Sequence, residues 1–268
     1  MTTLPHHRAF RRLATAAASA ALGLAATLTA AAPASAEEDR LALLRPTLDA
    51  HGGLDRWRAQ RTFTYTLTGF PLSEAMSQPN THTFDLQRRV NRIDGTGFTV
   101  AYNGHTAWST GQENSSGLPS RFVSLGSSYF IVMPFVFADP GTIITDAGTV
   151  DYQGKPHRAI NVGYETGVGA SSEDAYQLLI DPQTDRLVAI NHSVTEIGVE
   201  RVTWGYPQWQ ETDGLLVPAR LEFTKGWDPQ NAEPGAFTEV TNVDFTTTAP
   251  DANLYEPLPG STIDSVDE

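Results

Sequence analysis

Residues 98–109 read FTVAYNGHTAWS, and this stretch does most to set the fold class. Bulky and small side chains alternate on both sides of Asn103-Gly104-His105, as they do in strands that bury one face. Asn-Gly is a pair that readily supplies the two positive φ angles of a tight turn between antiparallel strands. The stretch therefore predicts a β-hairpin, with residues 98–102 as one strand and residues 106–109 as the other.

The same strand-like texture begins after Arg61 and persists to the end of the chain, interrupted by Gly, Asn, Asp and Pro. Further strands are expected at residues 62–70, 83–93, 149–152, 157–164, 176–180, 186–192, 196–204, 215–223 and 237–245. Asp181-Pro182 marks another turn between two of them. Short turns of this kind favour an antiparallel meander, so the predicted class is mainly β, with about ten strands and some helix. The acidic tail after Pro257 is expected to be frayed.

Residues 37–60 carry apolar side chains every three or four positions, which predicts an amphipathic N-terminal helix with a break at Gly52-Gly53. His51 followed by Gly52 suits a helix end, because the imidazole can bond the last carbonyls and the glycine can take a left-handed conformation. A catalytic role for His51 is the alternative interpretation.

Residues 118–138 interrupt the strand pattern with a dense apolar and aromatic segment that contains Pro134. The segment is too short and too polar at its start to span a membrane, so one or two short helices broken at Pro134 are expected. Two interpretations remain open, plain core packing and a helical lid that lines a concave ligand site. On the second, the predicted hydrophobic ligand-binding residues are Phe122, Leu125, Tyr129, Phe130, Met133, Phe135 and Phe137.

Composition limits the partners of the chain. It has 268 residues with 40% hydrophobic content, enough for a substantial core, and a net charge of −13. This acidity opposes binding to nucleic acid and strong binding to anionic membranes, which both require clustered Lys or Arg. The absence of cysteine excludes disulfides and cysteine metal sites. The oligomeric state stays open.

Residues 1–36 have the layout of a cleaved export signal peptide. Arg8, Arg11 and Arg12 precede a long run rich in Ala and Leu, and Ala34-Ser35-Ala36 forms a small-residue cleavage site. A transmembrane anchor is the competing interpretation, but the run is dominated by Ala and Thr, and acidic residues follow it at once. Both Sec and twin-arginine export remain open. Residues 37–268 are then expected to form a single β domain, soluble and either periplasmic or extracellular.

Motifs that carry chemistry are largely missing. The sequence has no G-x-S-x-G elbow and no S-x-x-K, and His82, His105, His157 and His192 are scattered singly, so neither a metal nor a cofactor is predicted. Five acidic residues of expected strands offer a glycosidase-like pair in principle, although acids on strand faces are usually solvated. They are Glu196, Glu200, Glu222, Glu239 and Asp244.

Several turn and packing motifs resemble those of a known family. They are His51-Gly52-Gly53-Leu54 with Trp57, Tyr102-Asn103-Gly104 with Trp108, Asp151-Tyr152-Gln153-Gly154-Lys155, the segment 176–190 around Asp181-Pro182, Gly214-Leu215-Leu216-Val217-Pro218, and Asn253-Leu254-Tyr255-Glu256-Pro257. In these the chain resembles the lipoprotein-localisation-factor superfamily of periplasmic lipoprotein carriers and outer-membrane lipoprotein-sorting-like proteins. The resemblance implies an incomplete barrel of curved antiparallel sheet, closed by helices, with acyl chains held inside and residues 122–137 as the lid.

Three functions follow as hypotheses. The leading one is a non-enzymatic exported protein that binds a lipid, an acylated lipoprotein or another hydrophobic ligand in a concave cavity. The alternative is an exported hydrolase or isomerase that uses the same concavity, with residues such as His192 and Glu222 brought together from different strands. The third is an envelope protein-interaction module that uses a sheet edge or an acidic face.

Overall fold

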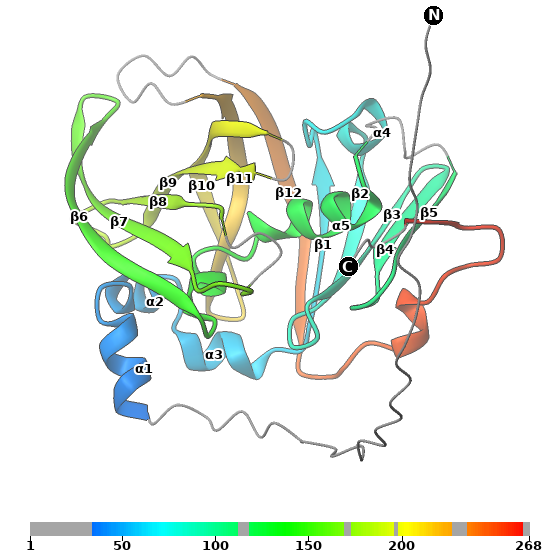
Figure 1. Ribbon diagram of the computed structural model, residues 1–268, viewed down its shortest axis with the longest axis horizontal. Coiled ribbons are helices and arrows are strands. Elements are labelled where there is room, and N and C mark those ends of the chain that lie inside the picture. The colour runs from blue at the N-terminus through cyan, green and yellow to red at the C-terminus, as the bar shows by residue number, and fades with distance from the viewer. Residues whose placement is uncertain (1–33, 112–117, 169–172, 196–197, 227–234, 265–268) are drawn as a thin grey trace, which may run out of the picture. The chain divides into compact units, whose positions relative to one another are not determined.

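In the computed structural model, thirteen strands form one antiparallel sheet (Figure 1). The structure describes residues 34–264 apart from 112–117, 169–172, 196–197 and 227–234. The spatial order is β13-β5-β4-β3-β2-β1-β12-β11-β10-β9-β8-β7-β6. The sheet is curved and not closed into a barrel, which confirms the predicted fold class. Most of the predicted export signal lies in residues 1–33, outside the described residues.

The strands belong to two meanders that meet at their ends. The first runs through β1 (Thr62–Thr68), β2 (Asn80–Asp85), β3 (Val90–Gly95), β4 (Phe98–Tyr102) and β5 (Ala107–Gly111). The second runs through β6 (Thr142–Tyr152), β7 (Lys155–Tyr164), β8 (Tyr176–Ile180), β9 (Leu187–Val194), β10 (Val199–Thr212), β11 (Leu215–Lys225) and β12 (Ala236–Thr246). The two join where β1 pairs with β12, with Phe63 opposite Phe245 and Leu67 opposite Val240.

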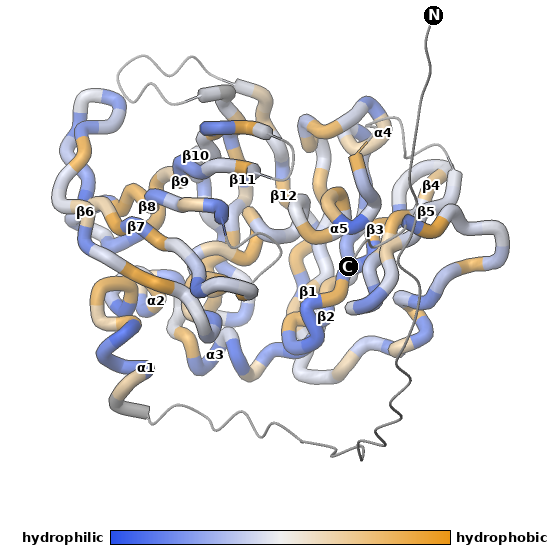
Figure 2. The backbone as a smooth tube through the Cα atoms, viewed as in Figure 1, coloured by the Kyte–Doolittle hydropathy of each residue, from blue (hydrophilic) through white to orange (hydrophobic). Residues whose placement is uncertain are grey.

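β1 shows why the sheet buries one face. Its sequence TFTYTLT alternates Thr with larger side chains, and Phe63, Tyr65 and Leu67 are all 0% exposed. Successive residues of a strand point to opposite faces, so these three enter the inner core together. The Phe63 ring stacks on Phe245 of β12 at 4.4 Å between centroids. Figure 2 shows hydrophobic and hydrophilic stretches interspersed along the strands of the sheet.

The predicted strand at residues 83–93 is wrong, because the chain turns in its middle between β2 and β3. The Asp85 carboxylate accepts hydrogen bonds from the backbone N–H groups of Gln87 and Arg88, at 3.1 and 3.0 Å. Arg89 completes the turn with a φ of 57°. An Asp side chain that bonds its own downstream backbone makes a turn without Gly or Pro, and the sequence reading therefore missed it.

The hairpin of β4 and β5 is confirmed, but its turn differs from the predicted one. Gly104 has a φ of 103°, whereas Asn103 does not have a positive φ. The Asn103 side chain instead accepts hydrogen bonds from the N–H groups of His105 and Thr106, at 3.0 and 2.8 Å. Asn103 therefore makes the turn through its side chain rather than through a left-handed backbone.

The N-terminal helical region contains three short helices, α1 (Ala34–Leu41), α2 (Arg45–Ala50) and α3 (Leu54–Ala59). Gly52 has a φ of 109° and follows the end of α2, as predicted. The predicted capping role of the His51 side chain is wrong, because its Nε2 accepts a hydrogen bond from the N–H of Leu187 in β9, at 3.1 Å. Burial lowers the His51 pKa to about 3, so the imidazole is a neutral acceptor that joins the helices to the sheet.

The apolar segment contains two helices, α5 (Ser120–Tyr129) and the 3₁₀ helix η2 (Phe135–Ala138), which begins directly after Pro134. This confirms the predicted break at Pro134. α5 packs on β3, β4 and β5 within the curve of the sheet (Figure 1). Two further short helices are α4 (Glu74–Ser77) and η4 (Ala252–Tyr255). No helix in the described part of the chain is long and apolar enough to cross a membrane.

The tail is ordered as far as Asp264, so the predicted fraying is wrong there. β13 (Thr262–Ile263) pairs with β5 at the edge of the sheet. The Asp264 carboxylate accepts hydrogen bonds from the backbone N–H of Ser120 and from the Ser120 hydroxyl. Ser120 is the first residue of α5, so this carboxylate satisfies an N–H at the positive end of the helix dipole.

Candidate ligand-binding cavity

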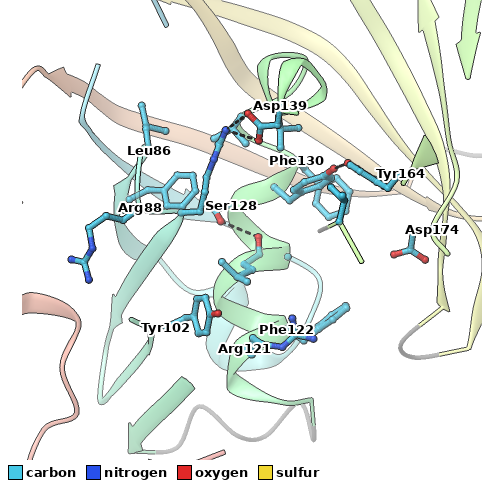
Figure 3. A pocket seen from close by; sticks show the side chains of 18 of the residues that line it. Leu86, Arg88, Tyr102, Arg121, Phe122, Ser128, Phe130, Asp139, Tyr164 and Asp174 are labelled. Carbon is cyan, nitrogen blue, oxygen red and sulfur yellow. Dashed lines mark hydrogen bonds and ion pairs between the residues drawn. The ribbon is translucent and has the colours of Figure 1, made fainter. Parts of the chain in front are cut away.

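A cavity of about 850 Å³ lies between α5, the β2–β3 turn and the inner face of β7 to β9. Ligand sites commonly have volumes of roughly 300–1,000 Å³, so this space can hold a lipid chain. Most of its lining is apolar or aromatic, including Phe84, Leu86, Val132, Val136 and Val194. Figure 3 shows α5 along the cavity, with Phe122 and Arg121 near its N-terminal end and Phe130 and Tyr164 near its C-terminal end.

Four of the predicted ligand-binding residues line this cavity. Phe122, Leu125 and Tyr129 lie along one side of α5, and Phe130 follows the helix. Spacings of three and four residues place side chains on one helix face, which is why they come together here. The first half of the apolar segment thus has the position expected of a lid.

The other three predicted residues, Met133, Phe135 and Phe137, belong to the core and are not among the lining residues. Their exposed fractions are 1%, 2% and 0%. Phe135 stacks on Trp57 of α3 at 4.6 Å, and the Met133 sulfur accepts a hydrogen bond from the Tyr206 hydroxyl at 3.3 Å. The segment therefore contributes both to the cavity lining, mainly through α5 and Phe130 with Val132 and Val136, and to the core, through Met133, Phe135 and Phe137.

Three tyrosines gather at the C-terminal end of α5. The Tyr129 hydroxyl bonds the Tyr164 hydroxyl of β7, and the Tyr176 ring of β8 lies 5.7 Å from Tyr129 and 6.0 Å from Tyr164. Burial raises the pKa of Tyr164 to about 12 and raises the pKa values of Tyr129 and Tyr176 as well. All three hydroxyls are thus protonated at neutral pH.

His192 on β9 lines the same end of the cavity and is 3% exposed. Its ring stacks on Tyr176 at 5.2 Å, and its Nδ1 lies 2.8 Å from the Ser193 carbonyl oxygen. Burial lowers its pKa to about 4, so the ring is neutral and Nδ1 carries the proton that it donates to this carbonyl. Nε2 is then a bare acceptor, and it has no hydrogen-bond partner among the described residues.

Charged groups at this end of the cavity are held by protein partners. Arg89 pairs with both oxygens of Asp139, at 2.5 and 2.6 Å. Asp174 accepts hydrogen bonds from the N–H and the hydroxyl of Thr195, both at 2.7 Å. The charge of Arg89 is therefore matched by Asp139, and Asp174 adds a further carboxylate to the lining.

The sequence reading missed the β-sheet half of the lining. Tyr176 and His192 are direct partners across β8 and β9, and residues two positions along, Leu178 and Ile190, enter the same core. Alternation within residues 176–180 was a usable signal for the inner face of β8. The strand order that brings this face opposite α5 was not readable from local patterns.

The suggested pairing of His192 with Glu222 is wrong. His192 lies opposite Val202, while Glu222 lies opposite Gly205, three residues further along β10. An odd separation on a strand changes the face, so the two side chains lie on opposite faces of the sheet. Glu196 of the suggested acidic set lies outside the described residues. Within the described ranges no group of three His, Asp or Glu side chains could hold a metal ion.

Comparisons with protein-family models and with curated protein sequences give no match. Among solved structures, the chain is similar to a LolA superfamily protein from Nitrosomonas europaea, with 9% identity, a TM-score of 0.49, and coverage of 81% of this chain and 97% of that one. A domain described as an outer-membrane lipoprotein-sorting protein, from Vibrio parahaemolyticus, matches at 8% identity and a TM-score of 0.41, covering 76% and 97%. A DUF1329 family protein from Desulfovibrio piger matches at 10% identity and 0.42, covering 78% and 97%. The first two belong to the kind of protein that the sequence resembles, and the likeness is one of fold.

Proposed function

We propose that this chain is an exported, non-enzymatic binding protein that holds a lipid, an acyl chain of a lipoprotein or another hydrophobic molecule in the cavity beside α5. The observation that carries the proposal is the cavity of about 850 Å³ with a largely apolar lining. Transfer of each methylene from water to such a site contributes about 0.8 kcal/mol. A chain of about twelve methylenes would gain roughly 10 kcal/mol before the costs of association, enough for useful affinity without many polar contacts.

Export is part of the proposal and rests on the sequence. The basic start, the Ala- and Leu-rich run and the small-residue site at 34–36 form the pattern of a cleaved signal. A mature chain released in this way would meet its cargo in the periplasm or outside the cell. Mass spectrometry of the protein from its native envelope gives its N-terminus, and a mature chain that retains residues 1–30 would contradict this part.

The cavity is tested by uptake of a fluorescent fatty acid and by native mass spectrometry of protein purified from its own envelope. Leu125→Asp places a charge in the lining, and we expect it to weaken uptake at least tenfold because the carboxylate would be desolvated. Ile143→Asp is the matched control, since Ile143 is an apolar residue of β6 that is 49% exposed and does not line the cavity. Equal uptake by the two folded variants would contradict the proposal. Co-purification of a stoichiometric lipid would support it and identify the ligand class.

A further inference from the structure

The polar end of the cavity has one acceptor and one donor that the protein does not use. The acceptor is His192 Nε2, which is buried and has no partner in the described part of the chain. The donor comes from the tyrosines, because the Tyr129 hydroxyl bonds the Tyr164 hydroxyl and the neighbouring Tyr176 adds a third O–H. The three hydroxyls carry three O–H groups and the hydrogen bond between Tyr129 and Tyr164 uses one of them, so the group keeps an O–H for a ligand. A buried polar group without a partner costs free energy, which a ligand can recover.

We propose that this end of the cavity, formed by Tyr129, Tyr164, Tyr176 and His192, is a specificity site for a hydroxyl group on an otherwise apolar ligand. This inference rests on the proposed binding function and names the ligand class. An alcohol both donates and accepts, so its O–H can donate to His192 Nε2 while its oxygen accepts from the free tyrosine O–H. An ether or an ester only accepts and leaves Nε2 without a partner.

An ionised carboxylate fits this end of the cavity less well than an alcohol. It has no proton for His192 Nε2, and Asp174 adds a negative charge, while the charge of Arg89 is already matched by Asp139. The C-terminal end of α5, at Tyr129 and Phe130, adds the negative pole of the helix dipole. Charge and hydrogen-bond capacity thus favour a neutral hydroxyl-bearing lipid over a fatty-acid anion.

The test compares 1-dodecanol with its isomer methyl undecyl ether, which has the same number of carbon and oxygen atoms but no O–H. Both displace the neutral fluorescent probe N-phenyl-1-naphthylamine from the purified mature protein at pH 8. We expect the alcohol to bind about fivefold more tightly, the effect of one additional hydrogen bond. We also expect dodecanoate to bind more weakly than the alcohol.

His192→Phe removes the acceptor and retains a ring that can stack on Tyr176, so the alcohol-to-ether ratio should fall to about one. Leu125→Ala is the control, because it shortens an apolar lining residue and should weaken both ligands equally, leaving the ratio unchanged. Equal affinities of alcohol and ether for the wild type, or tighter binding of dodecanoate, would overturn the hydroxyl site and leave the cavity proposal standing. Failure of both the alcohol and the ether to displace the probe would overturn the two proposals together. The ratio of the two affinities in the wild-type protein tests the hydroxyl site even where the His192 variant does not fold.

Discussion

Gly126 lies within α5, lines the cavity and allows substitutions that separate stability from binding. A Cβ added at this position would meet only ring carbons of Phe122, at 3.9 Å, and the residue does not have a positive φ. Gly in a helix interior is about 0.5–1 kcal/mol less favourable than Ala. Gly126→Ala should therefore stabilise the protein by about that amount, which raises the melting temperature by roughly 1–4 °C for a domain of this size.

Gly126→Trp uses the same position to fill the cavity. If the indole takes the space of about four ligand methylenes, at about 0.8 kcal/mol each, the affinity for a long acyl chain should fall by roughly 200-fold. Urea unfolding and titration with a fluorescent fatty acid measure the two effects, and the Ala variant is the control for the backbone change. A destabilised Ala variant would refute the described packing of α5. A folded Trp variant with unchanged affinity would refute the location of the ligand.

Three further predictions concern stability. Burial lowers the pKa values of His51, His82 and His192 to about 3, 3 and 4, so the unfolded chain takes up protons first as the pH falls below about 6.5. The free energy of unfolding should therefore be highest above pH 6.5 and should fall on acidification by up to about 4 kcal/mol per pH unit. Urea midpoints that stay constant between about pH 6 and about pH 4.5 would contradict this. Gly52→Ala should destabilise by at least about 2 kcal/mol, because its Cβ would lie 2.2 Å from the Gly214 carbonyl oxygen at a φ of 109°. Gly53 has a φ of 91°, but a Cβ added there would have no atom within 4 Å. Gly53→Ala should therefore lower the free energy of unfolding by less than Gly52→Ala in the same urea assay, because only backbone strain remains. Asp264→Ala should cost about 1 kcal/mol and speed hydrogen exchange at the start of α5, and unchanged exchange there would show that the carboxylate does not cap the helix.

The sequence predicted those parts of the fold that depend on neighbouring residues. β1 follows from the alternation TFTYTLT, and the short helices on either side of Pro134 follow from the dense apolar composition of residues 118–138 and from the proline. The β2–β3 turn was missed because Asp85 makes it through a side-chain hydrogen bond rather than through glycine.

Contacts between residues that lie far apart in the sequence could not be predicted from local sequence patterns. His51 lies 136 residues from Leu187 along the chain, and its bond to that strand depends on how the helices fold against the sheet. The polar end of the cavity likewise joins Tyr129 of a helix to Tyr164 and His192 of different strands. Only the strand order, with β1 beside β12, determines that these residues meet.

The contact between Asp264 and Ser120 also orders events during synthesis. The two residues are 144 positions apart, so α5 leaves the ribosome long before the strand and the carboxylate that fix its first turn. Until residues 262–264 emerge, the helix beside the cavity lacks this anchor. Assembly of the cavity wall is therefore completed only after the remainder of the described sheet has been made.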